Sequence, residues 1–161
     1  MFGLRAIKTP EEIHSEKRYD TQMKFLRERM GDAANKYATG YTWDQLWQIR
    51  LGFGCRDEIG VKTSPMVEVE KYDDPIYNWR QMAQIRIGMT KGINVDLYRN
   101  PEFSAEQMIE IRIMLEAGLK EKDLAKILDP SVTHYEMRRF AARRGIKYVK
   151  KEITANANAR V

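Results

Sequence analysis

The sequence predicts an all-α protein, built as a solenoid-like array of helical hairpins. Three observations carry this prediction. Four helix starts share one capping signature, and the stretches 77–93 and 103–119 nearly repeat each other around Gln-Met-x-x-Ile-Arg-Ile. Asx-Pro pairs then close the repeated units, because the residue before a proline is pushed out of the helical region. A helical hairpin of this size cannot bury its apolar face alone, so we expect neighbouring units to stack.

Residues 1–40 are expected to form an N-terminal helical segment. Thr9 is a suitable N-cap, Pro10 suits the first helical position and Glu12 completes a capping box. We expect helix over most of 10–38, with an interruption near Tyr19 or Asp20 and an end at Gly40.

The four later helix starts are predicted from matched pairs of residues. Each pair has an N-cap residue and, three positions on, a side chain that reaches back to the cap amide: Thr42 with Gln45, Asn78 with Gln81, Ser104 with Gln107, and Thr133 with Glu136. An apolar residue precedes each cap, and another follows at the fourth helical position, as in a hydrophobic staple. Gly92 and Gly118 stand where two of these helices should end.

The first repeat is longer than the others, with an insertion over 54–76 in the array that spans 41–130. Its segment "MVEVEKY" alternates apolar and polar residues, which is typical of a strand, and "IGVKT" precedes it across Ser64-Pro65. We therefore expect a small β-hairpin insertion near 58–72. Insertions in repeat proteins often carry the binding role.

The excess of positive over negative charge lies in the last fifth of the chain. The 161 residues carry a net charge of +5, and residues 131–161 alone carry +6 while residues 1–130 carry −1. Such a local field attracts phosphates or an acidic protein face. We divide this end into a terminal repeat helix with a basic segment, 131–152, and a flexible tail, 153–161, within one compact domain overall.

Composition also bounds the class of protein. Cys55 is the single cysteine, so no internal disulfide is possible, and no apolar run is long enough for a membrane span. We expect a cytoplasmic protein without membrane contact. His14 and His134 are far apart, and no phosphate loop, nucleophile elbow or zinc spacing occurs. The sequence thus predicts no enzyme, no metal and no cofactor.

Residues 119–145 resemble a helix-turn-helix DNA-binding motif. Leu124, Ala125 and Leu128 fit its first helix, and Thr133 to Arg144 would be its recognition helix. The resemblance implies that the start of the second helix enters the major groove and that later basic residues contact phosphates. The implied nucleic-acid-binding residues are His134, Tyr135, Arg138, Arg139, Arg143, Arg144, Lys147, Lys150 and Lys151. Alternatively, the segment is the last repeat of the array, with a polar face for solubility.

A second set of arginines recurs at one helix position. Arg50, Arg86 and Arg112 each lie eight residues after a cap and would form a basic ladder if the helices stack. The ladder would bind phosphates or an acidic partner. On a structural reading, each arginine instead lays its stem along the core and donates to a loop group such as Asp74, Asn100 or Asp129.

Units such as "YNWRQMAQIRIGMTKGINVDLYRNP" look like short tandem repeats in proteins of phages and bacterial mobile elements. That resemblance implies an interaction module in a bacterial or phage-infected cell. Our first interpretation is a non-enzymatic nucleic-acid-binding protein, with DNA favoured over RNA. The alternative is a protein-interaction module or an anti-CRISPR-like inhibitor of a host nucleoprotein, including a nucleic-acid-bound protein. Self-association into a homo-oligomer is compatible with both interpretations.

Overall fold

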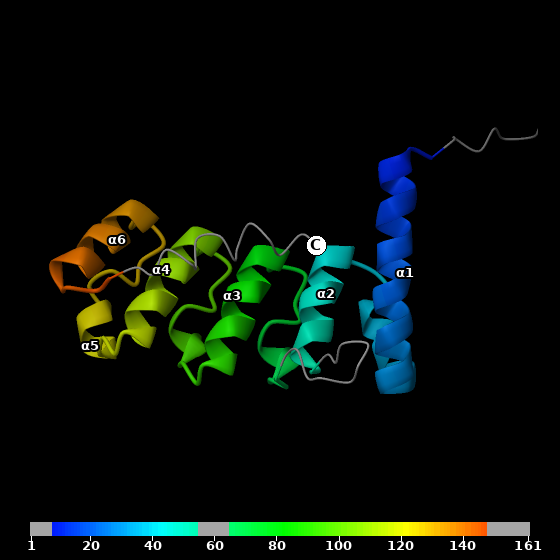
Figure 1. Ribbon diagram of the computed structural model, residues 1–161, viewed down its shortest axis with the longest axis horizontal. Coiled ribbons are helices and arrows are strands. Elements are labelled where there is room, and N and C mark those ends of the chain that lie inside the picture. The colour runs from blue at the N-terminus through cyan, green and yellow to red at the C-terminus, as the bar shows by residue number, and fades with distance from the viewer. Residues whose placement is uncertain (1–7, 55–64, 148–161) are drawn as a thin grey trace, which may run out of the picture. The chain divides into compact units, whose positions relative to one another are not determined.

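The computed structural model describes residues 8–54 and 65–147, and throughout these ranges the regular elements are helices, with no strand (Figure 1). The all-α class is therefore confirmed. The α-helices and the short 3-10 helices (η) follow in the order α1 Pro10–Met30, η1 Gly31–Tyr37, α2 Trp43–Gly52, η2 Val69–Lys71, α3 Trp79–Thr90, η3 Val95–Leu97, α4 Ala105–Glu116, α5 Glu121–Leu124 and α6 His134–Arg143.

The chain divides into two compact units, Met1–Arg86 and Ile87–Val161, with the boundary inside α3. In the first unit α1 packs against both η1 and α2, and in the second α4 packs against α6. Each unit buries its own apolar side chains, among them Met23, Leu26, Tyr37, Leu46 and Ile49 in the first and Met108, Ile111, Met114 and Met137 in the second.

α1 runs without a break from Pro10 to Met30, so the expected interruption near Tyr19 or Asp20 is wrong. Nothing there forces a break: the Tyr19 hydroxyl donates to the carbonyl oxygen of Ala38 at 2.7 Å and ties the middle of the helix to the chain that returns beside it. The predicted capping box at Thr9 is present. The α-helix ends instead at Gly31, whose φ of 60° favours glycine, and η1 continues to Tyr37.

All four predicted helix starts are confirmed. Capping boxes join Thr42 to Gln45, Ser104 to Gln107 and Thr133 to Glu136, and Asn78 and Gln81 make the same two hydrogen bonds at the start of α3. We name the units that begin at these caps the first (42–77), second (78–103), third (104–132) and fourth (from 133) repeat. Gly92 and Gly118 end α3 and α4 with positive φ, as predicted.

The strand expected over "MVEVEKY" is wrong, because Val69–Lys71 form the 3-10 turn η2. Val69 and Tyr72 are both buried. Residues three apart lie on the same side of a 3-10 turn but on opposite faces of a strand, so burial of both in one core selects the turn. The "IGVKT" half of the expected hairpin, together with Cys55, lies outside the described residues.

In each of the first two repeats, the tyrosine that follows the 3-10 turn packs its hydroxyl against a helix glycine. Gly52 and Gly88 lie ten residues after their caps, and a Cβ added there would meet the hydroxyl oxygen of Tyr72 or Tyr98 at 2.0 Å. The Tyr72 hydroxyl donates to the Gln48 carbonyl oxygen at 2.9 Å. Burial raises the pKa of both tyrosines.

The third repeat fills the same space differently. Met114 stands ten residues after its cap, and Ile127 occupies the position of the two tyrosines, six residues before the next cap. Both side chains are buried. A large residue on the helix is thus matched by a smaller one on the turn, which keeps the combined volume nearly constant.

In the part of the chain that the structure describes, no helix is both long and apolar enough to cross a lipid bilayer.

Candidate nucleic-acid interface

The glutamine of the capping box also binds the loop that leads to the next cap. Gln107 accepts through Oε1 from the Ser104 N–H at 2.7 Å, and its Nε2 donates to the carbonyl oxygens of Pro130 and Val132 at 2.8 and 2.7 Å. The side chain is only 6% exposed. An amide is needed here because one end must accept while the other donates. The same set of bonds joins Gln45 to Thr42, Pro75 and Tyr77.

Two arginines of the predicted ladder bind glutamines of a neighbouring helix. Arg50 Nη1 donates to Gln22 Oε1 at 3.2 Å, and Arg86 Nε donates to Gln48 Oε1 at 3.2 Å. The Arg50 guanidinium also lies over the ring of Phe25, 4.5 Å from its centroid. These partners differ from the loop groups expected on the structural reading. They hold the arginines among packed side chains rather than in an exposed stripe.

Arg112, the third member of the predicted ladder, is only 3% exposed and forms an ion pair with Glu116 one turn along α4. Glu116 also pairs with Lys91 at 2.6 Å. A phosphate could reach Arg112 only after displacing this carboxylate, so its charge contributes little to a surface field.

Arg138, from the predicted nucleic-acid-binding set, neutralises a buried carboxylate. Its Nε and Nη2 atoms donate to Glu110 Oε1 at 2.9 and 2.6 Å. Glu110 is 1% exposed, whereas about half of the Arg138 side chain is exposed. Sequence reasoning missed Glu110. The available signal was its position six residues after a cap, where the first two repeats carry Gln48 and Gln84.

We expect Arg138→Ala to destabilise the fold by about 2 kcal/mol, because it removes a cation that binds the buried Glu110 carboxylate. Because about half of the Arg138 side chain is exposed, water screens the ion pair and keeps the loss of stability below that of a fully buried pair. Urea denaturation of Arg138→Ala, Glu110→Gln and the double variant measures the effect. The double variant should recover most of the loss, since Gln48 shows that this position accepts an amide. If the double variant lost as much stability as Arg138→Ala alone, the ion-pair explanation would be contradicted.

α6 exposes charged residues at positions that the earlier repeat helices bury. Three, six and ten residues after the cap, those helices carry buried side chains or glycines: Gln45, Gln48 and Gly52 in α2, Gln81, Gln84 and Gly88 in α3, and Gln107, Glu110 and Met114 in α4. The same positions in α6 are Glu136, Arg139 and Arg143, all exposed. We name these three residues, with the neighbouring Tyr135, the outer face of α6.

The remaining predicted residues that the structure describes lie at the start of α6 and at or beyond its C-terminal end. The rings of Tyr135 and His134 are in contact, with centroids 3.9 Å apart and planes tilted by 37°. The Arg144 guanidinium lies over the Phe140 ring, 3.5 Å from its centroid, and Lys147 is exposed. Arg139, Arg143, Arg144 and Lys147 thus gather near the C-terminal half of α6 and beyond its end. Lys150 and Lys151 lie outside the described residues.

The N-terminal end of α6 is acidic by contrast. Hydrogen bonds from Thr133, whose hydroxyl donates to Glu136 at 2.8 Å, lower the pKa of the Glu136 carboxyl. Hydrogen bonds from Ser131 likewise lower the pKa of Asp129. The charge of Arg139 also lowers the pKa of Glu136. Two exposed carboxylates thus lie at or just before the first turn of α6, whereas Arg143, Arg144 and Lys147 lie toward its other end.

The segment that resembles a helix-turn-helix motif contains two helices of unequal length. α5 is a single turn, Glu121–Leu124, and buries Leu124 and then Ile127 at the places where η2 and η3 bury Val69 and Val95 with their tyrosines. α6 begins at the Thr133 cap and buries Met137. The motif itself stays a prediction.

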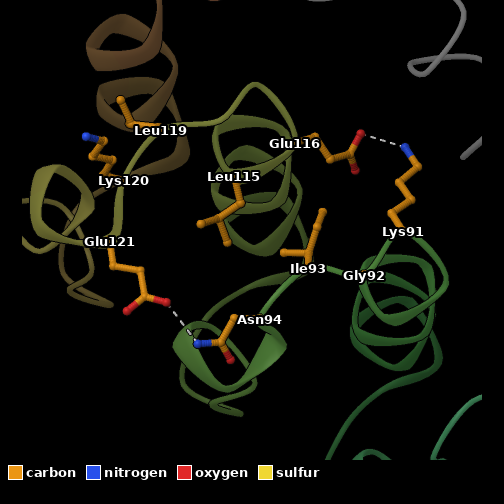
Figure 2. Close-up of a pocket in the computed structure, with 9 residues that line it drawn as sticks. All are labelled: Lys91, Gly92, Ile93, Asn94, Leu115, Glu116, Leu119, Lys120 and Glu121. Atoms are coloured by element: carbon orange, nitrogen blue, oxygen red, sulfur yellow. Dashed lines mark hydrogen bonds and ion pairs between the residues drawn. The ribbon is translucent and has the colours of Figure 1, made fainter.

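A cleft of about 750 Å³ lies between the glycine turn that follows α3 and the turn that follows α4. Figure 2 shows Ile93 and Leu115 between two polar pairs, Lys91 with Glu116 and Asn94 with Glu121. The Asn94 amide donates to Glu121 at 3.0 Å. The cleft thus has an apolar floor and a rim of both charges, which suits an amphipathic peptide better than a phosphate.

No known family model matches the sequence, and no curated protein or solved structure matches it either. Across 8–54 and 65–147, no three His, Cys, Asp or Glu side chains lie together as metal ligands.

Proposed function

We propose that this chain is a non-enzymatic nucleic-acid-binding protein that contacts phosphates through Arg139 and Arg143 on the outer face of α6. This proposal rests on exposed Arg139 and Arg143, which take the two helix positions that are buried in all three earlier repeats, as Gln and Gly in the first two and as Glu110 and Met114 in the third. A cap needed only for solubility could use any polar residue. Arginine instead offers a planar, permanently charged donor set that matches phosphate oxygens.

The proposal includes a solenoid-like stacking of the repeats, in which α6 keeps its outer face exposed. Two observations support this exposure. Glu136 replaces the glutamine of the earlier capping boxes, and a carboxylate cannot donate to the carbonyls of a following loop. Arg138 points its charge back toward Glu110 of the third repeat, which leaves Arg139 on the other side of the helix.

Arg139→Ala/Arg143→Ala is expected to weaken nucleic-acid binding roughly tenfold at low salt, because two phosphate contacts are lost. The slope of log Kobs against log salt should fall in magnitude by about 2. Fluorescence anisotropy with labelled DNA and RNA, each at several salt concentrations, measures both quantities. Arg138 is left unchanged, since its removal would also destabilise the fold.

The matched control is Lys17→Ala/Arg27→Ala, which removes two exposed cations from α1 and changes the net charge equally. If both double variants bind alike, the interaction follows net charge and the outer face of α6 has no special role. If the wild type fails to bind any nucleic acid at low salt, the proposed function is wrong.

The alternative function, a protein-interaction module or an inhibitor of a nucleoprotein, is favoured by the cleft over Ile93 and Leu115. Binding there should depend weakly on salt, because its floor is apolar. A partner whose affinity falls in Leu115→Asp, yet is unchanged in Arg139→Ala/Arg143→Ala, would support the alternative over phosphate binding.

A further inference from the structure

We infer that the nucleic acid held by the outer face of α6 is single-stranded and that Tyr135 is a stacking platform for one of its bases. This inference rests on the proposed function and specifies its ligand. Proteins that bind single strands combine a basic surface that follows the backbone with aromatic rings on which unpaired bases stack. The outer face of α6 places both kinds of group on one side of one helix.

Tyr135 is the aromatic member of this arrangement. Its side chain is 64% exposed, although burying an aromatic ring would stabilise the fold. The His134 ring lies against it, with centroids 3.9 Å apart and planes 37° apart. This contact restricts the motion of the tyrosine ring, so a base that stacks on it loses less conformational entropy on binding.

Arg139 and Arg143 follow Tyr135 at intervals of four residues, so all three side chains lie along one stripe of α6. Each step advances about 6 Å along the helix axis. A base on Tyr135 would therefore have its neighbouring phosphates close to two guanidinium groups. A flexible single strand can adapt its backbone to this spacing.

The charges at the start of α6 disfavour the duplex alternative. Entry of the helix N-terminus into a major groove would carry the exposed carboxylates of Asp129 and Glu136 between two phosphate backbones. Both carboxylates are exposed and therefore ionised at neutral pH, so they would repel the phosphates. A duplex also keeps its bases stacked on one another, so it offers no free base to Tyr135 except at its ends.

The test compares Tyr135→Ala and Tyr135→Phe with the wild type in anisotropy titrations. The probes are labelled oligothymidine, labelled oligouridine and a labelled DNA duplex of matched length. Tyr135→Ala should weaken single-strand binding roughly tenfold while duplex binding changes little. Tyr135→Phe should bind as the wild type does, because a phenyl ring also stacks. Circular dichroism melts check that these exposed substitutions leave the fold intact.

The outcomes separate this inference from the proposed function. If Tyr135→Ala binds both single strands as the wild type does while Arg139→Ala/Arg143→Ala loses affinity, base stacking is wrong and phosphate binding stands. Equal losses for single strand and duplex in Tyr135→Ala would also overturn the inference. If the wild type binds none of the three probes at low salt, the inference and the proposed function fall together.

Discussion

Gln107→Glu is expected to lower the free energy of unfolding by about 4 kcal/mol at neutral pH. The glutamine amide donates to the carbonyl oxygens of Pro130 and Val132 from a site that is 6% exposed. A glutamate has nearly the same shape and would still accept from the Ser104 N–H. Its second oxygen, however, would face two carbonyl oxygens as a buried anion, with both donated hydrogen bonds lost.

The reciprocal substitution Glu136→Gln is the matched control. Glu136 occupies the same capping position but is exposed, so we expect this substitution to change the free energy of unfolding far less than Gln107→Glu does. Urea denaturation of both variants makes the comparison. Equal effects would show that the two amide-to-carbonyl bonds contribute little.

The pH dependence of Gln107→Glu gives an independent check. Burial beside two carbonyls raises the folded-state pKa of the introduced carboxyl above its unfolded value of about 4.3. The native state therefore takes up a proton first as the pH falls, and the protonated acid can again donate one hydrogen bond. The stability deficit relative to the wild type should shrink as the pH falls from about 7 toward 4.3.

Gly52→Ala is expected to destabilise the fold by about 3 kcal/mol, although alanine is normally the better helix residue. The added Cβ would lie 2.0 Å from the Tyr72 hydroxyl oxygen and 2.9 Å from Val69 Cγ2. Tyr72 is fully buried and is held by its hydrogen bond to Gln48, so it cannot move aside without opening the core. Thermal and urea denaturation measure the loss.

A second substitution tests the cause of that loss. Tyr72→Phe removes the hydroxyl that the new methyl group would meet, and alone it should cost about 1 kcal/mol for the lost hydrogen bond. In the double variant Gly52→Ala/Tyr72→Phe the two effects should not add, and the double variant should be more stable than Gly52→Ala. Simple additivity would mean that the steric account is wrong.

The sequence by itself determined the helix starts, the all-α class and the basic end. A capping box such as Thr42 with Gln45 is a contact between residues three positions apart, and it depends on little beyond the local backbone. Gly92 and Gly118 mark helix ends for the same reason, because their positive φ is a property of single residues. Interactions between residues this close in sequence can therefore be recognised as sequence motifs.

Only the tertiary structure decided which cations are engaged and which are exposed. Arg138 and Arg139 are neighbours in sequence, yet Arg138 binds Glu110 and Arg139 lies on the outer face of α6. Likewise, the alternation around Val69 predicts a strand, but burial of both Val69 and Tyr72 in one core selects a 3-10 turn. Glu110 lies 28 residues before Arg138, and the core that buries Val69 and Tyr72 is formed with other elements of the chain. Only packing brings these groups together, so local sequence cannot specify either contact.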